Sequence, residues 1–111
     1  MGCPMRRGEI YYADLGTEIN KRRPVLIVSN EANNRAANTV TVLPITSNVS
    51  RIYPFEIPLA PKESGLPKPS KAQAQQIRTI SKERLRGGAK GRLGPVLMRK
   101  AADAMRLHLD L

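Results

Sequence analysis

Four polar residues stand where the sequence predicts that strands begin or end: Arg23, Thr46, Gln76 and Arg78. Side chains at strand ends can converge on one cleft. Two guanidinium groups, a hydroxyl and an amide can hold phosphate oxygens and offset the charge that develops when an RNA strand is cut by its own 2′-hydroxyl. The same spacing also fits arginines that merely flank strands at the surface, so both interpretations stay open at this point.

Metal or cofactor chemistry is not predicted. The chain has a single histidine, His108, and a single cysteine, Cys3, and its carboxylates are too scattered to supply three or four ligands at metal-binding spacing. A lone histidine in a predicted helix is more often a surface or interface residue than a catalyst. Cys3 cannot form an intramolecular disulfide, which fits a reducing compartment. No signal-peptide pattern is visible, so we expect a cytoplasmic protein.

The composition predicts one small basic domain that spans residues 1–111. A hydrophobic content of 41% supports a compact core. The longest apolar run, Val25 to Val28, is far too short to cross a membrane. Nineteen Lys and Arg against nine Asp and Glu give a formal net charge of +10. Such a charge attracts polyanions, so a nucleic acid is the expected partner, and an acidic protein would also satisfy it.

Five segments have the apolar and β-branched composition of strands. They are residues 9–15, 24–30, 39–46, 53–59 and 73–80. The second is apolar at most positions, which is typical of a strand covered on both faces. Pro44 lacks an amide hydrogen and is expected near an edge or a bulge. In the fourth segment, alternation predicts that Glu56 and the prolines lie opposite the apolar and aromatic side chains.

The remaining segments predict loops and one helix. Residues 16–22, 60–71 and 87–91 are expected as loops, and residues 81–86 as a short turn or helical piece. Residues 94–111 begin with Gly-Pro and predict an amphipathic helix. Its apolar stripe consists of Leu97, Ala101, Met105 and Leu109. Short strands followed by one helix predict an α+β fold that is mainly β, a small antiparallel barrel-like sheet with the helix packed on it.

The glycine-rich stretch Gly88 to Gly91 fits the GxxG pattern that clamps RNA backbones in KH domains. The pattern is only four residues long, and the helices that should flank it are not predicted. We therefore interpret the stretch as a flexible basic loop that can touch phosphates.

Five short motifs follow one another along nearly the whole chain. They are residues 7–11 (RGEIY), 13–15 (ADL), 23–28 (RPVLIV), 44–47 (PITS) and 76–80 (QIRTI). In this order they resemble the MazF/PemK family, the toxins of bacterial type II toxin–antitoxin pairs. Each motif alone is short, but five in register make a chance match improbable.

The resemblance implies an SH3-like sheet of the CcdB/PemK type and a homodimer with its RNA groove along the interface. It also implies sequence-specific, metal-independent cleavage of single-stranded mRNA and neutralisation by an acidic MazE-like antitoxin. Carried over by motif, Arg23 and Thr46 become catalytic residues, and Gln76 and Arg78 match RNA-binding positions. Because an arginine with a pKa above ~12 is a poor base, Arg23 is expected chiefly to hold and neutralise the phosphate.

One loop departs from the family pattern. Residues 16–22 lack the family's usual Gly-x-Glu-Gln stretch and keep only Gly16 and Glu18. That loop helps to choose the RNA sequence in the family, so the cleavage motif does not carry over. Glu18 is assigned to RNA binding, and as a carboxylate in this loop it is also the candidate for the general base.

A second function stays open: a non-catalytic nucleic-acid binder, or a gyrase-inhibiting toxin such as the related CcdB type, which shares the fold. A simple binder more often exposes aromatic side chains for base stacking. Here the alternation places most of the few aromatic residues in the core. The pairing of Arg23 with Thr46 at strand ends therefore favours the nuclease.

Overall fold

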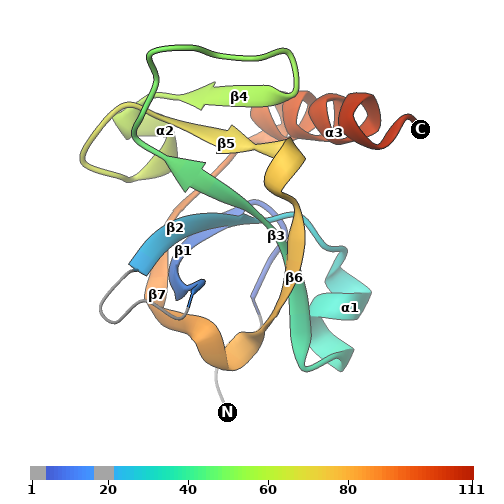
Figure 1. Cartoon of the computed structure of the whole chain (residues 1–111). Coiled ribbons are helices and arrows are strands. Elements are labelled where there is room, and N and C mark those ends of the chain that lie inside the picture. Colours follow the sequence, from blue (N-terminus) through green and yellow to red (C-terminus); the bar gives the residue numbers. More distant parts are fainter. Residues whose placement is uncertain (1–4, 17–21) are drawn as a thin grey trace.

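Seven strands form an antiparallel sheet in the computed structural model, which describes residues 5–16 and 22–111. In these ranges the strands are β1 (Glu9–Asp14), β2 (Arg22–Ile27), β3 (Thr39–Thr46), β4 (Glu56–Leu59), β5 (Ser70–Gln73), β6 (Arg78–Ser81) and β7 (Leu85–Arg92) (Figure 1). Their order is β4-β5-β3-β2-β1-β7, and β6 also pairs with β3. No ladder between described residues joins β7 to β6. The sheet is therefore curled but open, and the predicted barrel holds only as a loose description.

Strand β3 is the central strand, which corrects the expected edge position of Pro44. On one side β3 pairs with β2, and Val25 lies opposite Pro44. On the other side its first half pairs with β6 as far as Val42, and its last two residues pair with β5 from Ile45 onward. Pro44 thus falls between the two partners on that side. A residue without an amide hydrogen is tolerated there, because neither ladder needs a donor from it.

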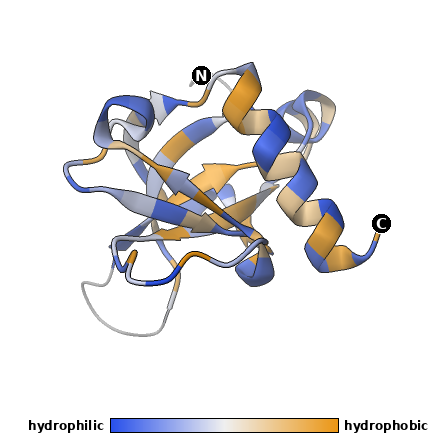
Figure 2. Cartoon of the chain, turned by 90° about the horizontal axis from the view of Figure 1, so that it is seen from above, coloured by the Kyte–Doolittle hydropathy of each residue, from blue (hydrophilic) through white to orange (hydrophobic). Residues whose placement is uncertain are grey.

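Both faces of the central strands are buried, as the apolar run in β2 predicts. Alternate residues such as Leu26, Leu43 and Ile45 join a cluster that also contains the buried face of the terminal helix. Val25, Ile27 and Val42 point the other way, into a second cluster enclosed by the curl of the sheet. Figure 2 shows the apolar colouring concentrated on these inner strands.

The helices are α1 (Glu31–Ala36), α2 (Pro61–Ser64) and α3 (Pro95–Leu109), with 3-10 turns η1 (Ala74–Gln76) and η2 (Lys82–Arg84). The helix predicted over 94–111 is confirmed. Ala101 is buried, and Leu97 and Met105 pack against the core. Leu109, the last residue of the predicted stripe, is 45% exposed and is not part of the core.

Three other predictions need correction. The loop predicted over 60–71 contains α2 and the start of β5, and the strand predicted over 73–80 is divided into β5 and β6 by η1. The loop predicted over 87–91 belongs to β7, which pairs with β1 across a register shift between Ile10 and Tyr12. The strand pairs with β1 at its two ends, Leu85–Arg86 and Gly91–Arg92, and residues 87–90 fall within the register shift between them. Helix α1 was not expected from the sequence. It begins after Asn30, and the Asn30 side chain accepts a hydrogen bond of 2.8 Å from the Asn33 amide.

The end of α2 lies directly against β7. Gly65 closes α2 with a φ of +77°, and a Cβ atom there would stand 1.9 Å from the Lys90 carbonyl oxygen. A Cβ atom on Gly91 would stand 2.2 Å from the Ser64 carbonyl oxygen. Both positions require glycine, because a Cβ atom at either would overlap the other backbone. At Gly65 the positive φ is a second reason. The contact fixes the position of the segment that follows Gly65.

Candidate functional site

A groove of about 390 Å³ opens where several strands end. It is lined by Leu15, Gly16, Arg23, Pro44, Ile45, Thr46, Gln73, Gln76 and Arg78. All four polar residues singled out at predicted strand ends therefore line one cavity. Three further residues that the sequence analysis missed are Leu15 and Gly16, which follow β1, and Gln73, which ends β5.

The pairing of β2 with β3 brings Arg23 and Thr46 together. Val25 lies opposite Pro44, and in an antiparallel ladder two further residues along each strand set Arg23 opposite Thr46. Side chains two positions apart share a face, so Arg23 projects on the same face as Val25 and Ile27. That face carries the inner apolar cluster. At the ends of β2 and β3 this face is no longer covered by the cluster and opens to solvent. The side chains of Arg23 and Thr46 both line the groove there.

Arg23 and Thr46 are both available to a ligand. Arg23 is exposed, and in the described ranges no carboxylate lies within ion-pair distance of it. The Thr46 hydroxyl oxygen accepts a hydrogen bond of 3.2 Å from the Asn48 amide. The hydroxyl hydrogen of Thr46 can still be donated to an oxygen of a bound phosphate.

Arg78 crosses the groove from β6. Its guanidinium donates a hydrogen bond of 3.0 Å to the Leu15 carbonyl oxygen, which uses one of its five N–H donors. Gln76 lies in η1 and is exposed. None of the described residues that line the groove is acidic. The cavity therefore presents two cations, two amides and a hydroxyl, a composition that suits a phosphodiester.

The other arginines near this end of β1 are engaged by Asp14. Arg86 donates a hydrogen bond of 2.8 Å from Nε to the Asp14 carboxylate, with its Nη2 also 2.8 Å from the same oxygen, and Arg22 lies 3.7 Å from the carboxylate. Arg84 donates to the Asp14 carbonyl oxygen at 3.0 Å. These contacts hold the end of β1 in place next to Leu15 and Gly16 of the groove.

A buried ion pair between Lys71 and Glu56 lies next to Thr46 in the sheet. Lys71 is the strand partner of Thr46, and its ammonium nitrogen is 2.9 Å from the Glu56 carboxylate. Glu56 lies opposite Ile57 and Leu59 of the core, as alternation predicts, but its side chain is only 1% exposed because its own face is covered as well. Four hydrogen bonds reach this carboxylate, from the Tyr53 amide and from the side chains of Lys71, Gln73 and Gln75. A charge can be buried here because it is paired and fully hydrogen-bonded.

The pKa of Glu56 reflects this environment. Burial by itself raises the pKa of the carboxyl, but the hydrogen bonds from Tyr53, Gln75, Lys71 and Gln73 outweigh it and lower the pKa from 4.5 to about 2. Gln73 also lines the groove, and Gln75 precedes Gln76 in η1. The ionised carboxylate therefore fixes the end of β5 and the turn η1, which supply one groove residue each.

Some predicted residues lie elsewhere. His108 is exposed near the end of α3, with its ring centroid 6.2 Å from that of Phe55, and it does not line the groove. Glu18 and Cys3 lie outside the described residues. In the described part of the chain, no three His, Cys, Asp or Glu side chains come together as metal ligands. No helix within the described ranges is long and apolar enough to cross a membrane.

Comparison with known proteins gives one consistent family. Residues 6–109 match the profile of the PemK-like, MazF-like toxin of type II toxin-antitoxin systems. The chain is 42% identical to endoribonuclease MazF9 of Mycobacterium tuberculosis over 116 aligned positions, which cover 96% of this chain and 98% of the relative. It is 33% identical to endoribonuclease EndoA of Bacillus subtilis, with 96% of each chain covered.

Solved structures agree in fold. A mycobacterial endoribonuclease in complex with its cognate antitoxin superposes with a TM-score of 0.83 at 32% identity, covering 96% of both chains. The Mycobacterium tuberculosis toxin MazF-mt6 superposes with a TM-score of 0.80 at 32% identity, covering 93% of this chain and 97% of the other.

The buried Glu56 carboxylate predicts a specific loss of stability in acid. Because its pKa is lower in the folded than in the unfolded chain, its contribution is complete above pH 4.5 and is lost as the pH falls toward 2. The shift corresponds to about 3 kcal/mol. Urea unfolding across this pH range should show that loss in the parent, whereas Glu56→Gln should be less stable at neutral pH and lack this part of the acid dependence. Asp103→Asn, at a carboxyl that is 67% exposed, is the matched control and should keep the parental profile.

Proposed function

Because the chain belongs to the PemK-like, MazF-like toxin family of type II toxin-antitoxin systems, we propose that it cuts single-stranded mRNA in the cytoplasm and so inhibits translation and growth. Endoribonuclease activity follows from the family and from the curated relatives. Our proposal adds sequence specificity, the strand that is cut, independence from metals, and the residues responsible. The observation that carries it is the juxtaposition of Arg23 and Thr46 at the end of the β2–β3 pair, in a groove whose described lining is basic.

In the proposed reaction the 2′-hydroxyl oxygen attacks the adjacent phosphorus atom. A bond forms between the 2′-oxygen and phosphorus, and the bond from phosphorus to the 5′-oxygen of the next nucleotide breaks. The products are a 2′,3′-cyclic phosphate and a 5′-hydroxyl. The proton of the attacking hydroxyl goes to a base, and the departing 5′-oxygen takes up a proton, so the step balances without a metal or a cofactor.

Arg23 neutralises the charge on the pentacoordinate phosphorus, and Thr46 donates a hydrogen bond to a non-bridging oxygen. An arginine remains protonated at neutral pH, so Arg23 does not serve as the base. It can donate a proton to the departing oxygen as a second role. Gln76 and Arg78 bind the strand next to the cut, as both line the same groove. Glu18 remains the carboxylate that we propose for RNA binding and as the candidate base.

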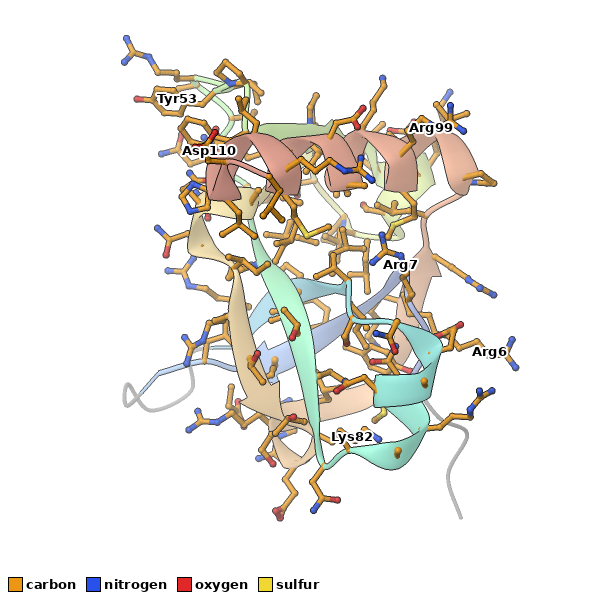
Figure 3. The ribbon with its side chains drawn as sticks, turned by 90° about the vertical axis from the view of Figure 1, so that its right-hand side faces the viewer. Arg6, Arg7, Tyr53, Lys82, Arg99 and Asp110 are labelled. Carbon is orange, nitrogen blue, oxygen red and sulfur yellow. The ribbon has the colours of Figure 1, made fainter. Side chains whose placement is uncertain are left out.

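We propose that the protein forms a homodimer through its exposed apolar end. Several large apolar side chains are exposed in the loop after β3 and at the end of α3: Val49, Ile52, Tyr53, Leu107, Leu109 and Leu111. The two regions adjoin, because the rings of Phe55 and His108 are in contact. Figure 3 shows Tyr53 at the same end of the molecule as Asp110. An apolar cluster of this kind favours burial against a second copy.

We propose a cognate, acidic MazE-like antitoxin as the second macromolecular partner. A mycobacterial relative with the same fold has been solved with its cognate antitoxin. In this chain an acidic segment and an RNA phosphate would both be attracted by the net charge of +10. Both would compete for Arg23 and Arg78, since carboxylates and phosphates take the same guanidinium donors.

The nuclease proposal predicts that the purified protein cuts a long single-stranded transcript into discrete fragments in excess EDTA. Arg23→Ala and Thr46→Ala should each slow cleavage by a factor of about 10² to 10³, because each removes a preorganised donor to the phosphate. Arg99→Ala and Thr39→Ala replace the same residue types at exposed positions away from the groove, and they should cut at the parental rate. Bound but intact RNA would favour a non-catalytic binder, and a parental rate for either groove variant would refute the site assignment.

The dimer proposal predicts a sedimentation mass of twice the 12.3 kDa chain at micromolar concentration. Leu107→Glu should shift the mass toward one chain, because a charge would have to be buried in the interface. Leu107 is 57% exposed in the single chain, so the substitution should leave the fold intact. Val96→Glu, at a 71% exposed position at the other end of α3, is the control and should stay dimeric. A monomeric parent would contradict the proposal.

The antitoxin proposal predicts mutual displacement. A fluorescence titration uses a labelled single-stranded RNA whose 2′-hydroxyls are blocked, so that it binds without being cut. The acidic segment of the antitoxin should displace this RNA from the protein, and the RNA should displace the segment. Both affinities should fall as the salt concentration rises. Binding releases counterions, and their release is less favourable at high salt. Simultaneous binding of both ligands to one groove, without mutual weakening, would exclude competition for Arg23 and Arg78.

A further inference from the structure

A second hollow of about 260 Å³ adjoins the groove. It is lined by Tyr12, Arg22, Arg23, Pro24, Ile45, Thr46, Ser47, Leu66, Pro67, Lys68 and Ser70. We call it the Tyr12 hollow. Three of its lining residues, Arg23, Ile45 and Thr46, also line the groove. The two cavities therefore adjoin at the pair to which we assign the phosphate, and their other lining residues differ.

The lining of the Tyr12 hollow combines an apolar wall with cations. The half-buried Tyr12 ring and Leu66 belong to this wall, and the Lys90 ammonium nitrogen lies 5.9 Å from the centroid of the Tyr12 ring. Lys68 is exposed at the rim, and no described residue forms a hydrogen bond or an ion pair with its ammonium group. An apolar and aromatic surface beside Lys68 and Arg23, neither of which has a carboxylate partner among the described residues, suits a nucleoside attached to a phosphate.

The wall that carries Lys68 is held rigidly. The close contact of Gly65 with the Lys90 carbonyl fixes where this segment leaves α2. The Leu66 amide then donates to the Ser64 hydroxyl oxygen at 3.0 Å, and the Ser70 hydroxyl donates to the Lys68 carbonyl oxygen at 2.9 Å. A preformed wall binds with a smaller loss of conformational freedom than a mobile loop would.

We infer that the Tyr12 hollow is a nucleoside subsite: it holds one of the two nucleosides that flank the scissile phosphate, and the other lies in the groove. The inference rests on the proposed nuclease function and deepens it. With the phosphate on Arg23 and Thr46, its two neighbouring nucleosides must leave it in different directions, and two cavities with otherwise different linings adjoin at this pair. Tyr12 provides an apolar surface for the base or sugar, and Lys68 binds the next phosphate along the strand.

The first test is kinetic and uses a short RNA that spans a cleavage site mapped with the parent protein. Lys68 touches a part of the substrate that does not react, so it should bind ground state and transition state alike. Lys68→Ala should therefore raise KM roughly tenfold at low salt with kcat unchanged, since a charge-assisted contact is lost. The slope of log affinity against log salt should also fall by about 0.7. Lys62→Ala, at an exposed lysine of α2 outside both cavities, should change neither quantity as much.

The second test locates the nucleoside directly. The same RNA, with 4-thiouridine placed on one side of the scissile phosphate and then on the other, is irradiated on the intact protein. One placement should crosslink to Tyr12 or its neighbours in the hollow, and the other should not. If the parent cuts RNA, but neither placement crosslinks there and Lys68→Ala matches Lys62→Ala in KM, the subsite is refuted while the nuclease stands. If the parent neither cuts nor binds RNA, the proposed function fails and the subsite fails with it.

Discussion

The antiparallel pairing of β2 with β3 is the constraint on which the rest of this structure depends. The register that sets Val25 opposite Pro44 buries alternate side chains of both strands in two separate apolar clusters. Continued to the ends of the strands, it sets Arg23 opposite Thr46. A slip of one residue would turn every side chain to the opposite face of the sheet. The burial that stabilises the fold therefore also determines which polar side chains meet at its edge.

Charge is distributed unevenly around this edge. Asp14 engages Arg22 and Arg86 through its side chain and Arg84 through its carbonyl oxygen. Arg23, one residue from Arg22, has no carboxylate partner in the described ranges and remains free to bind an anion. Since a guanidinium already engaged by a carboxylate binds a phosphate less readily, this pairing distinguishes Arg23 from the adjacent Arg22.

The buried Glu56–Lys71 pair connects the core to the same edge. Removing two charges from water is costly, and such a pair is tolerated only when further hydrogen bonds complete it. Glu56 meets that condition by accepting from Tyr53, Gln73 and Gln75 as well. These partners come from the loop after β3 and from the β5–η1 segment. The pair thus positions two segments that surround Thr46, although neither of its members lines either cavity.

The sequence by itself determined what depends on local pattern: β1 to β3, the terminal helix, and the four polar residues at strand ends. Five short motifs in order along the sequence also indicated the family. Tertiary structure decided the rest. Residues 87–91 lie within a strand because the residues at its two ends pair with β1, and Glu56 is buried because Lys71 and two glutamines meet it there. The Tyr12 hollow joins residues of β1 and the segment after Gly65, which lie far apart along the chain. Periodicity reports the face of one strand at a time, whereas these features depend on which segments become neighbours, and long-range packing alone sets that.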